Sequence, residues 1–147
     1  MRILSSAFEE NQHIPSKYTC QGENINPELS FTEVPNDAKS LVLIMDDPDT
    51  AMGTFVHWLV YNIDPKTPDV EENSVPDNGT EALNGAGKKG YIGPCPPSGT
   101  HRYFFKLYAL NIQLKLSSNA DKKEIEEAMN GHILDQSELV GLYQKNS

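Results

Sequence analysis

Basic residues and long hydrophobic runs are scarce in this sequence. Its 147 residues include 12 Lys and Arg against 21 Asp and Glu, which gives a formal net charge of −9. Proteins that bind duplex nucleic acid need an excess of Lys and Arg on one face to neutralise phosphates, so this charge argues against a nucleic-acid partner. The longest apolar run, Leu41 to Met45, is far shorter than the roughly 20 residues that cross a bilayer. We therefore expect no stable membrane insertion.

Cysteine is equally scarce. The spacing of the two cysteines, Cys20 and Cys95, fits neither a zinc ribbon nor a C-x-x-C redox pair. Because 37% of the residues are apolar, a chain of this length buries one core without disulfide staples, and Cys20 is expected to be a small buried apolar residue. The length predicts a single domain over residues 1–147. The first residues show no secretory signal, which favours a cytoplasmic location.

Strand patterns dominate the chain, and helix patterns are few. The clearest strands are a branched apolar run at 41–45 that ends in a turn, and two longer segments at 55–63 and 102–116. Shorter strand candidates are 3–8, 28–34 and 132–143. One helix is expected within 119–129, with Gly131 as its left-handed stop. Several strands bounded by Pro and Gly predict a mostly β fold, a sandwich or a barrel, with one or two short helices.

Acidic and basic residues are separated along the chain. Residues 23–81 hold thirteen acidic and two basic residues, whereas residues 82–120 hold five basic residues and no acid. Two such stretches of one small domain are expected to meet across a surface. Arg102 lies in the basic stretch, and we expect it to form an ion pair with an acid from residues 23–81.

Two segments carry the candidate site residues. In the first, Asp47 and Asp49 flank Pro48, which restrains the backbone around both carboxylates. His57 follows within the 55–63 strand. A period of two along that strand predicts two faces, one with Phe55, His57, Leu59 and Tyr61 and the other with Val56, Trp58 and Val60.

The second segment is a loop rich in Pro and Gly, residues 90–100, which leads into a further histidine. By the period of two, His101 and Tyr103 share one face and Arg102 lies on the opposite one. Three prolines stiffen the loop, and backbone N–H groups are expected to turn inward and form an anion-binding concavity. These N–H groups belong to Gly93, Cys95, Ser98 and Gly99. Nearby carboxylates are expected to raise the pKa of the histidines, so that imidazolium groups add to the site.

These residues together resemble the phosphatidylethanolamine-binding protein family, also called the Raf kinase inhibitor protein family, in its prokaryotic branch. The resemblance rests on Asp47-Pro-Asp49 with His57-Trp58 and on the block that begins at Tyr91, Y-x-G-P-C-P-P-x-G-x-H-R-Y-x-F-x-L-Y-A-L. Further similar segments near Cys20 and after residue 130 extend it over nearly the whole chain. One departure is Ala51, which stands where the family usually has a second proline at the rim of its pocket.

The resemblance implies a β-sandwich of two antiparallel sheets with Greek-key connections and a small pocket for phosphate-like anions or phosphoryl headgroups. Carried over position by position, the implied ligand-binding residues are Asp47, Asp49, His57, Gly93, Cys95, Pro96, Pro97, His101 and Tyr103. We expect no cofactor, and a small phosphorylated or anionic ligand as the partner. A kinase or a protease is the candidate protein target, and the oligomeric state is open, with a homodimer among the alternatives.

Two other functions fit the same residues. Asp–His pairs could act as general acid and base in a hydrolase or phosphoryl-processing enzyme, with Cys95 or Ser98 as the nearby nucleophile. Two histidines and two carboxylates also suit iron, zinc or manganese, although the pocket of the family is not a metal centre. A binding protein is the leading hypothesis, because the sequence shows no evident activated nucleophile, and we expect no bound metal.

Overall fold

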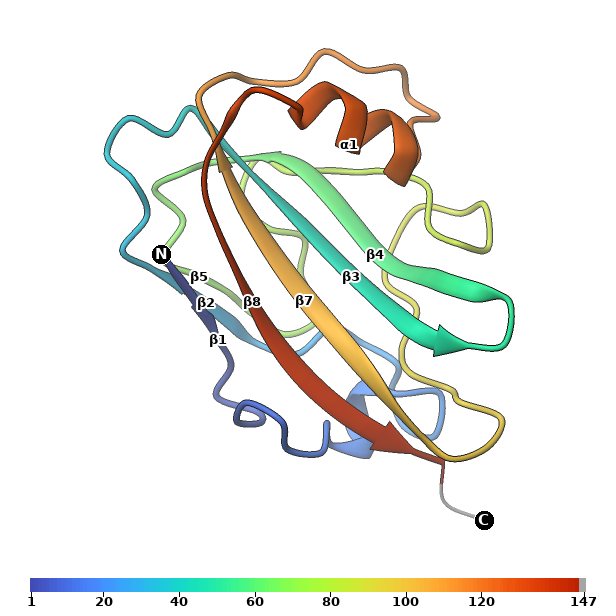
Figure 1. The fold of residues 1–147 in the computed structure, drawn as a ribbon. Coiled ribbons are helices and arrows are strands. Elements are labelled where there is room, and N and C mark those ends of the chain that lie inside the picture. Colours follow the sequence, from blue (N-terminus) through green and yellow to red (C-terminus); the bar gives the residue numbers. More distant parts are fainter. Residues whose placement is uncertain (146–147) are drawn as a thin grey trace.

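Two antiparallel sheets form the body of the protein (Figure 1). The computed structural model describes residues 1–145. Its elements in chain order are β1 (Arg2–Leu4), the 3-10 helix η1 (Ser16–Tyr18), β2 (Leu29–Thr32), β3 (Ser40–Thr50), β4 (Gly53–Ile63), β5 (Asp69–Val70), β6 (Thr80–Glu81), β7 (Thr100–Leu110), α1 (Lys122–Met129) and β8 (Ile133–Gln144). The smaller sheet has the strand order β1-β2-β5 and the larger sheet β6-β4-β3-β7-β8. The mostly β architecture of two antiparallel sheets is therefore confirmed.

The main core lies between the two sheets, because alternate side chains of their strands point toward each other. Leu29 and Phe31 come from the smaller sheet, and Leu43 and Phe105 from the larger one. All four are buried. Phe105 also packs against Phe8, with ring centroids 5.7 Å apart. Burial of such side chains is the main favourable contribution to folding, and it fixes the sheet whose ends carry the site.

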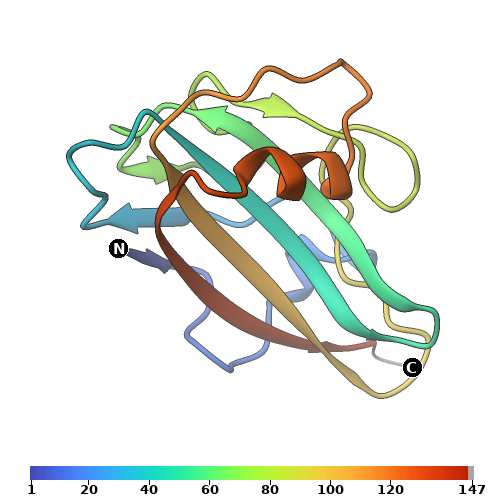
Figure 2. The same ribbon diagram turned by 45° about the horizontal axis from the view of Figure 1, so that its top comes forward.

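Helix α1 covers the opposite face of the larger sheet, where Figure 2 shows it lying across the strands. It begins after Asp121, whose carboxylate accepts the backbone N–H of Glu124 at 3.0 Å. Ile125 and Met129 are its buried residues, and Gly131 follows with a φ of 83°. The predicted helix and its glycine stop are confirmed. Within residues 1–145 no helix is long and apolar enough to cross a membrane.

Two of the long strands differ in extent from the prediction. β3 does not turn away after Met45 but continues through Asp47 and Pro48 to Thr50. A register shift between Asp47 and Thr50 in the pairing with β4 accommodates the proline, which has no N–H for a ladder hydrogen bond. β7 ends at Leu110, before its predicted end. The extension of β3 carries the Asp-Pro-Asp segment out to the edge of the core.

A β-bulge in β4 overturns the predicted faces of this strand. Met45 of β3 pairs with Trp58, but Asp46 pairs with Val56, so His57 is an extra residue in β4. The alternation of side chains changes phase at this residue. On one observed face Phe55 and His57 line the cavity and Trp58 and Val60 pack toward the smaller sheet. On the other face are Val56, Leu59 and Tyr61, toward α1. The predicted faces were wrong because a strict period of two holds only where the hydrogen-bond ladder between β3 and β4 is uninterrupted.

The two cysteines form a disulfide, although the composition was expected to make such a staple unnecessary. Cys20 and Cys95 are 75 residues apart in sequence, but their Cα atoms are 5.5 Å apart in the structure. Both residues are exposed, and Cys20 is therefore not a buried apolar residue. The fold brings the two loops side by side, since the N–H of Cys20 donates to the carbonyl oxygen of Pro94 at 3.1 Å. A chain able to bury a full core carries a covalent staple in addition.

Candidate functional site

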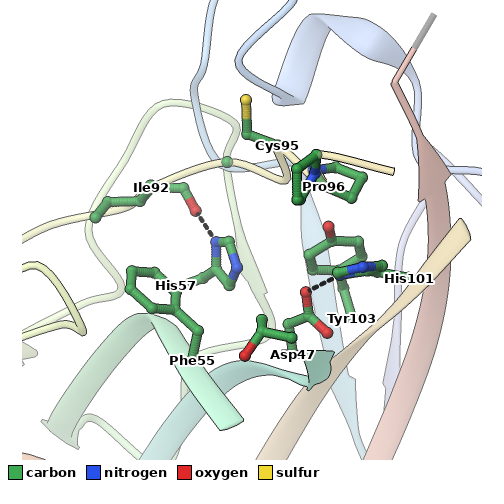
Figure 3. Close-up of a pocket in the computed structure, with 11 residues that line it drawn as sticks. Asp47, Phe55, His57, Ile92, Cys95, Pro96, His101 and Tyr103 are labelled. Carbon is green, nitrogen blue, oxygen red and sulfur yellow. Dashed lines mark hydrogen bonds and ion pairs between the residues drawn. The ribbon is translucent and has the colours of Figure 1, made fainter. Parts of the chain in front are cut away.

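A cavity of about 260 Å³ opens where the β3–β4 hairpin, the start of β7 and the loop at 91–97 meet (Figure 3). Eight of the predicted site residues line it: Asp47, His57, Gly93, Cys95, Pro96, Pro97, His101 and Tyr103. Asp49 is the predicted residue that does not line it. Thr50, Phe55 and Ile92 line it as well and were missed. The signal for Phe55 was present in the sequence, because it lies two residues before His57 on the same predicted face.

Asp47 and His101 form a buried pair in this cavity. Nδ1 of His101 lies 2.6 Å from Oδ2 of Asp47, and the two residues are 9% and 2% exposed. Because a carboxylate only accepts, this nitrogen carries a proton and donates it to the hydrogen bond. The other carboxylate oxygen of Asp47 accepts the backbone N–H of Asp49 at 2.7 Å. Both oxygens of the carboxylate are thus held, which fixes the orientation of the imidazole ring.

His57 is oriented by the loop rather than by a carboxylate. Its Nδ1 lies 2.7 Å from the carbonyl oxygen of Ile92, so this nitrogen donates and Nε2 is left for the cavity. Burial lowers the pKa of His57, and the neighbouring charge of Asp47 opposes this effect without reversing it. The expectation of a raised pKa is therefore wrong for His57. At neutral pH its imidazole is uncharged in the free protein.

Tyr103 brings a hydroxyl group to the cavity that has no protein partner. The side chain is fully buried, and its Oη makes no hydrogen bond within residues 1–145. Burial, together with the negative charge of Asp47, raises the pKa of the Tyr103 hydroxyl, which therefore stays protonated. The ring is fixed by an edge contact with His57, with centroids 5.2 Å apart. Asp47, the neighbouring acceptor that helps to raise this pKa, already accepts from His101 and Asp49, so the Tyr103 O–H is a rigid donor that a ligand can use.

The backbone of the loop does not supply all the donors predicted from its sequence. The N–H of Gly93 donates to Oδ1 of Asn24 at 2.8 Å, and the N–H of Ile92 donates to the carbonyl oxygen of His57 at 3.0 Å. Gly93 is packed so closely that an added Cβ would lie 2.5 Å from the carbonyl oxygen of Tyr18. The glycine is required for this close approach, and its N–H holds the loop in place instead of facing an anion.

Asp49 points away from the cavity and binds Arg102. The guanidinium donates from Nη2 to Oδ1 of Asp49 at 2.8 Å and from Nε to Oδ2 at 3.0 Å. The hydrogen bonds to Arg102 lower the pKa of Asp49 to about 2. The carboxylate is therefore ionised at neutral pH and committed to the arginine. The predicted ion pair of Arg102 is confirmed, and it joins the acidic and basic stretches of the sequence.

We expect Arg102→Ala to change stability slightly and ligand affinity not at all. The Arg102 side chain is 54% exposed, and exposed ion pairs contribute little, so a decrease in the thermal midpoint of no more than about 4 °C is expected. The contribution of Asp49 is present above its unfolded pKa and is lost as the pH falls through its folded pKa of about 2, so the difference between variant and wild type should be smaller at pH 2 than at pH 7. Calorimetric melting at pH 7 and pH 2 measures both effects. A large loss of anion affinity would contradict this assignment.

The rim of the cavity is the β3–β4 turn that carries Ala51. The hydroxyl of Thr50 donates to the carbonyl oxygen of Gly53 and closes the turn. Met52 at its tip is 98% exposed. A side-chain hydrogen bond thus closes the rim at the position where the family pattern has a rigid proline.

Neither side chain predicted as a nucleophile is available in the cavity. Across residues 1–145 no group of three or more His, Cys, Asp or Glu side chains is arranged to hold a metal ion. Cys95 is bonded to Cys20 and has no free thiol. Ser98 does not line the cavity.

Comparison with known proteins gives a consistent result. Residues 4–144 match the family model described as phosphatidylethanolamine-binding protein. A UPF0098 protein of Methanothermobacter thermautotrophicus is 48% identical over 150 residues, covering 99% of both chains. Among solved structures, the phosphatidylethanolamine-binding protein homologue CT736 of Chlamydia trachomatis superposes with a TM-score of 0.95 at 43% identity, covering 99% of this chain and 97% of that one.

A more distant structure shares the fold. YbcL of Escherichia coli superposes with a TM-score of 0.90 at 24% identity, covering 99% of this chain and 98% of that one. The family match extends over both sheets and over every residue that lines the cavity. The chain belongs to the phosphatidylethanolamine-binding protein family.

Proposed function

We propose that the cavity binds a phosphate-like anion or a phosphoryl headgroup. The observation that carries the proposal is the buried hydroxyl of Tyr103, which has no partner in the described chain and lines the same cavity as His57 and His101. A buried donor left unsatisfied costs about 1–3 kcal/mol, so an acceptor atom of a ligand is favoured at this point. The oxygens of a phosphoryl group can accept from several donors at once.

Proton uptake at His57 makes the cavity suitable for an anion. His101 keeps its Nδ1–H on Asp47, which leaves Nε2 for the ligand. His57 is uncharged in the free protein, because burial lowers its pKa, and its Nε2 is then an acceptor. An anion beside this ring favours the imidazolium form. Binding is therefore coupled to proton uptake at His57.

A test uses calorimetric titration with inorganic phosphate and with sulfate. We expect His101→Ala to weaken binding about 10- to 100-fold, since it removes a hydrogen bond to a charged group. His132→Ala is the matched control, because His132 forms a hydrogen bond with Asn111 outside the cavity. This variant should bind like wild type. Sulfate does not titrate near neutrality, so its affinity should increase as the pH falls from 8 to 6, by at most about tenfold per pH unit.

The outcomes separate clearly. No binding by the wild-type protein, or equal binding by His101→Ala, would rule out the proposed site. Affinity for sulfate that does not change with pH would remove the proton uptake assigned to His57.

A second candidate is a hydrolase in which the Asp47–His101 pair activates water. The 2.6 Å contact between the two residues is the geometry of an oriented general base. Binding ranks first, because neither predicted nucleophile is available. Measurable phosphomonoester hydrolysis that is lost in His101→Ala would reverse this order. A kinase or protease target, a homodimer and the cytoplasmic location stay predictions.

A further inference from the structure

Residues 95–97 form the outer wall of the cavity, and this wall makes few hydrogen bonds to the rest of the protein. Upstream, Ile92, Gly93 and Pro94 are each held by a hydrogen bond to a neighbouring segment. By contrast, no hydrogen bond links residues 95–99 to any other part of the described chain. Pro96 and Pro97 lack the N–H that would be needed to donate one. This stretch re-enters regular structure only at Thr100, where β7 begins.

The disulfide is the covalent attachment of this wall. Cys95 lines the cavity and is bonded to Cys20, in the segment that follows η1. The Cys20 segment is itself tied down, since Cys20 donates to Pro94 and the hydroxyl of Tyr91 donates to the carbonyl oxygen of Tyr18 at 2.7 Å. The disulfide therefore links residues 95–99, which make no hydrogen bond to other segments, to the Cys20 segment, which makes several.

Both residues of this bond lie at the protein surface. Cys20 and Cys95 are both exposed, whereas a staple of the core is normally shielded. Thiol–disulfide exchange requires a thiolate to reach one sulfur, and exposed disulfides are the ones that reductants attack. Cys95 belongs to this surface disulfide and also lines the cavity. A reductant that breaks the bond can therefore change the shape of the site.

We infer that the Cys20–Cys95 disulfide is a thiol-sensitive control of anion binding, an inference that rests on the proposed function. Two equivalents of a low-molecular-weight thiol carry out the reduction. The first thiolate attacks one sulfur, breaks the S–S bond and forms a mixed disulfide, and the released cysteine thiolate takes up a proton. The second thiol displaces the first as an oxidised thiol dimer. The protein gains two electrons and two protons, as two cysteine thiols.

Reduction loosens the wall without removing the cavity. Gly93 keeps its bond to Asn24, and the Asp47–His101 pair lies on strands that the disulfide does not join. Residues 95–97 gain conformational freedom, which binding must then restrict again. We expect the reduced protein to bind phosphate about tenfold more weakly than the oxidised protein.

The experiment compares phosphate titrations of oxidised protein, of protein reduced with dithiothreitol and of reoxidised protein. Weaker binding after reduction and recovery after reoxidation are expected. The double variant Cys20→Ser/Cys95→Ser is the matched control, and it should bind like the reduced protein whether or not dithiothreitol is present. If the oxidised protein does not bind, the proposed function fails. If oxidised and reduced proteins bind equally, the proposed function stands and the redox control is overturned.

Limited proteolysis distinguishes local loosening of residues 95–99 from a general loss of stability in the reduced protein. Proteinase K cleavage followed by mass spectrometry is expected to cut within residues 95–99 only after reduction, and to leave the strands intact. Equal resistance in both redox states would contradict a loosened wall. Cleavage throughout the chain after reduction would show a general structural staple instead of a local control.

Discussion

The double variant Cys20→Ser/Cys95→Ser is expected to unfold with a free energy about 4 kcal/mol lower than that of the oxidised wild type. The disulfide joins residues 75 positions apart, so it closes a long loop in the unfolded chain and removes much of that chain's conformational entropy. A loss of this size is a large part of the 5–15 kcal/mol that is typical of a domain, yet it leaves the native state populated. Urea unfolding at pH 7 measures it.

Reductant supplies the control for this measurement. Wild-type protein in dithiothreitol should unfold at the same urea concentration as the double variant, and the variant should not respond to dithiothreitol. An oxidised wild type with the same midpoint as the variant would mean that the disulfide does not constrain the unfolded chain. Stability and anion affinity are separate quantities here, so either effect can be found without the other.

The second large effect is expected at Asp46, on the face of the larger sheet that α1 covers. This carboxylate is 1% exposed, and its Oδ2 accepts from Nζ of Lys106 at 3.0 Å and from Nζ of Lys122 at 3.1 Å. Its Oδ1 is buried without a partner among the described residues. Since either lysine alone leaves the buried charge paired, each single change to Met should cost little. Removing both leaves an uncompensated buried carboxylate, which costs about 3–5 kcal/mol.

The expected result is therefore a marked departure from additivity. Lys106→Met/Lys122→Met should lose clearly more stability than the sum of the two single variants, in urea unfolding at pH 7. Adding Asp46→Asn to the double variant should recover part of the loss, because it removes the unpaired charge. Additive losses of unfolding free energy, or no recovery on adding Asp46→Asn, would show that the two lysines are not alternative partners for the charge of Asp46.

Local patterns predicted most of the elements of the fold. Six strand segments were predicted from apolar runs, and the helix from the pattern of residues 119–131, because these signals lie within a few neighbouring residues. The exact ends were harder to find. β3 extends through Pro48 because a register shift opposite β4 accommodates the proline, and this depends on the partner strand rather than on the local sequence.

The disulfide could not be derived from the sequence by residue spacing. Nothing in the positions of Cys20 and Cys95 indicates that two loops 75 residues apart meet. Their contact depends on tertiary packing, including the close approach of Gly93 to Tyr18 and Asn24. A pairing of this kind becomes visible only once the loop is placed.

Most residues that line the cavity were predicted, but the charge state of His57 was not. The family resemblance placed Asp47 together with His101 and Tyr103, and the period of two placed the last two on one face. The charge on His57 depends on burial in three dimensions, which lowers its pKa against the pull of Asp47. Asp49 was assigned to the cavity, but the fold gives it to Arg102.

The bulge in β4 affects how this strand tolerates substitution. A regular strand gives an alternating tolerance profile, in which every second position rejects polar residues. Here the profile should change phase at His57, so that His57 and Trp58 are two adjacent sensitive positions on one face. Deleting His57 would restore the alternation at this point and leave Phe55 opposite Asp47 on the same face, but the cavity would lose the imidazole that this extra residue supplies. The length of β4, counted in single residues, is therefore itself a requirement of the site.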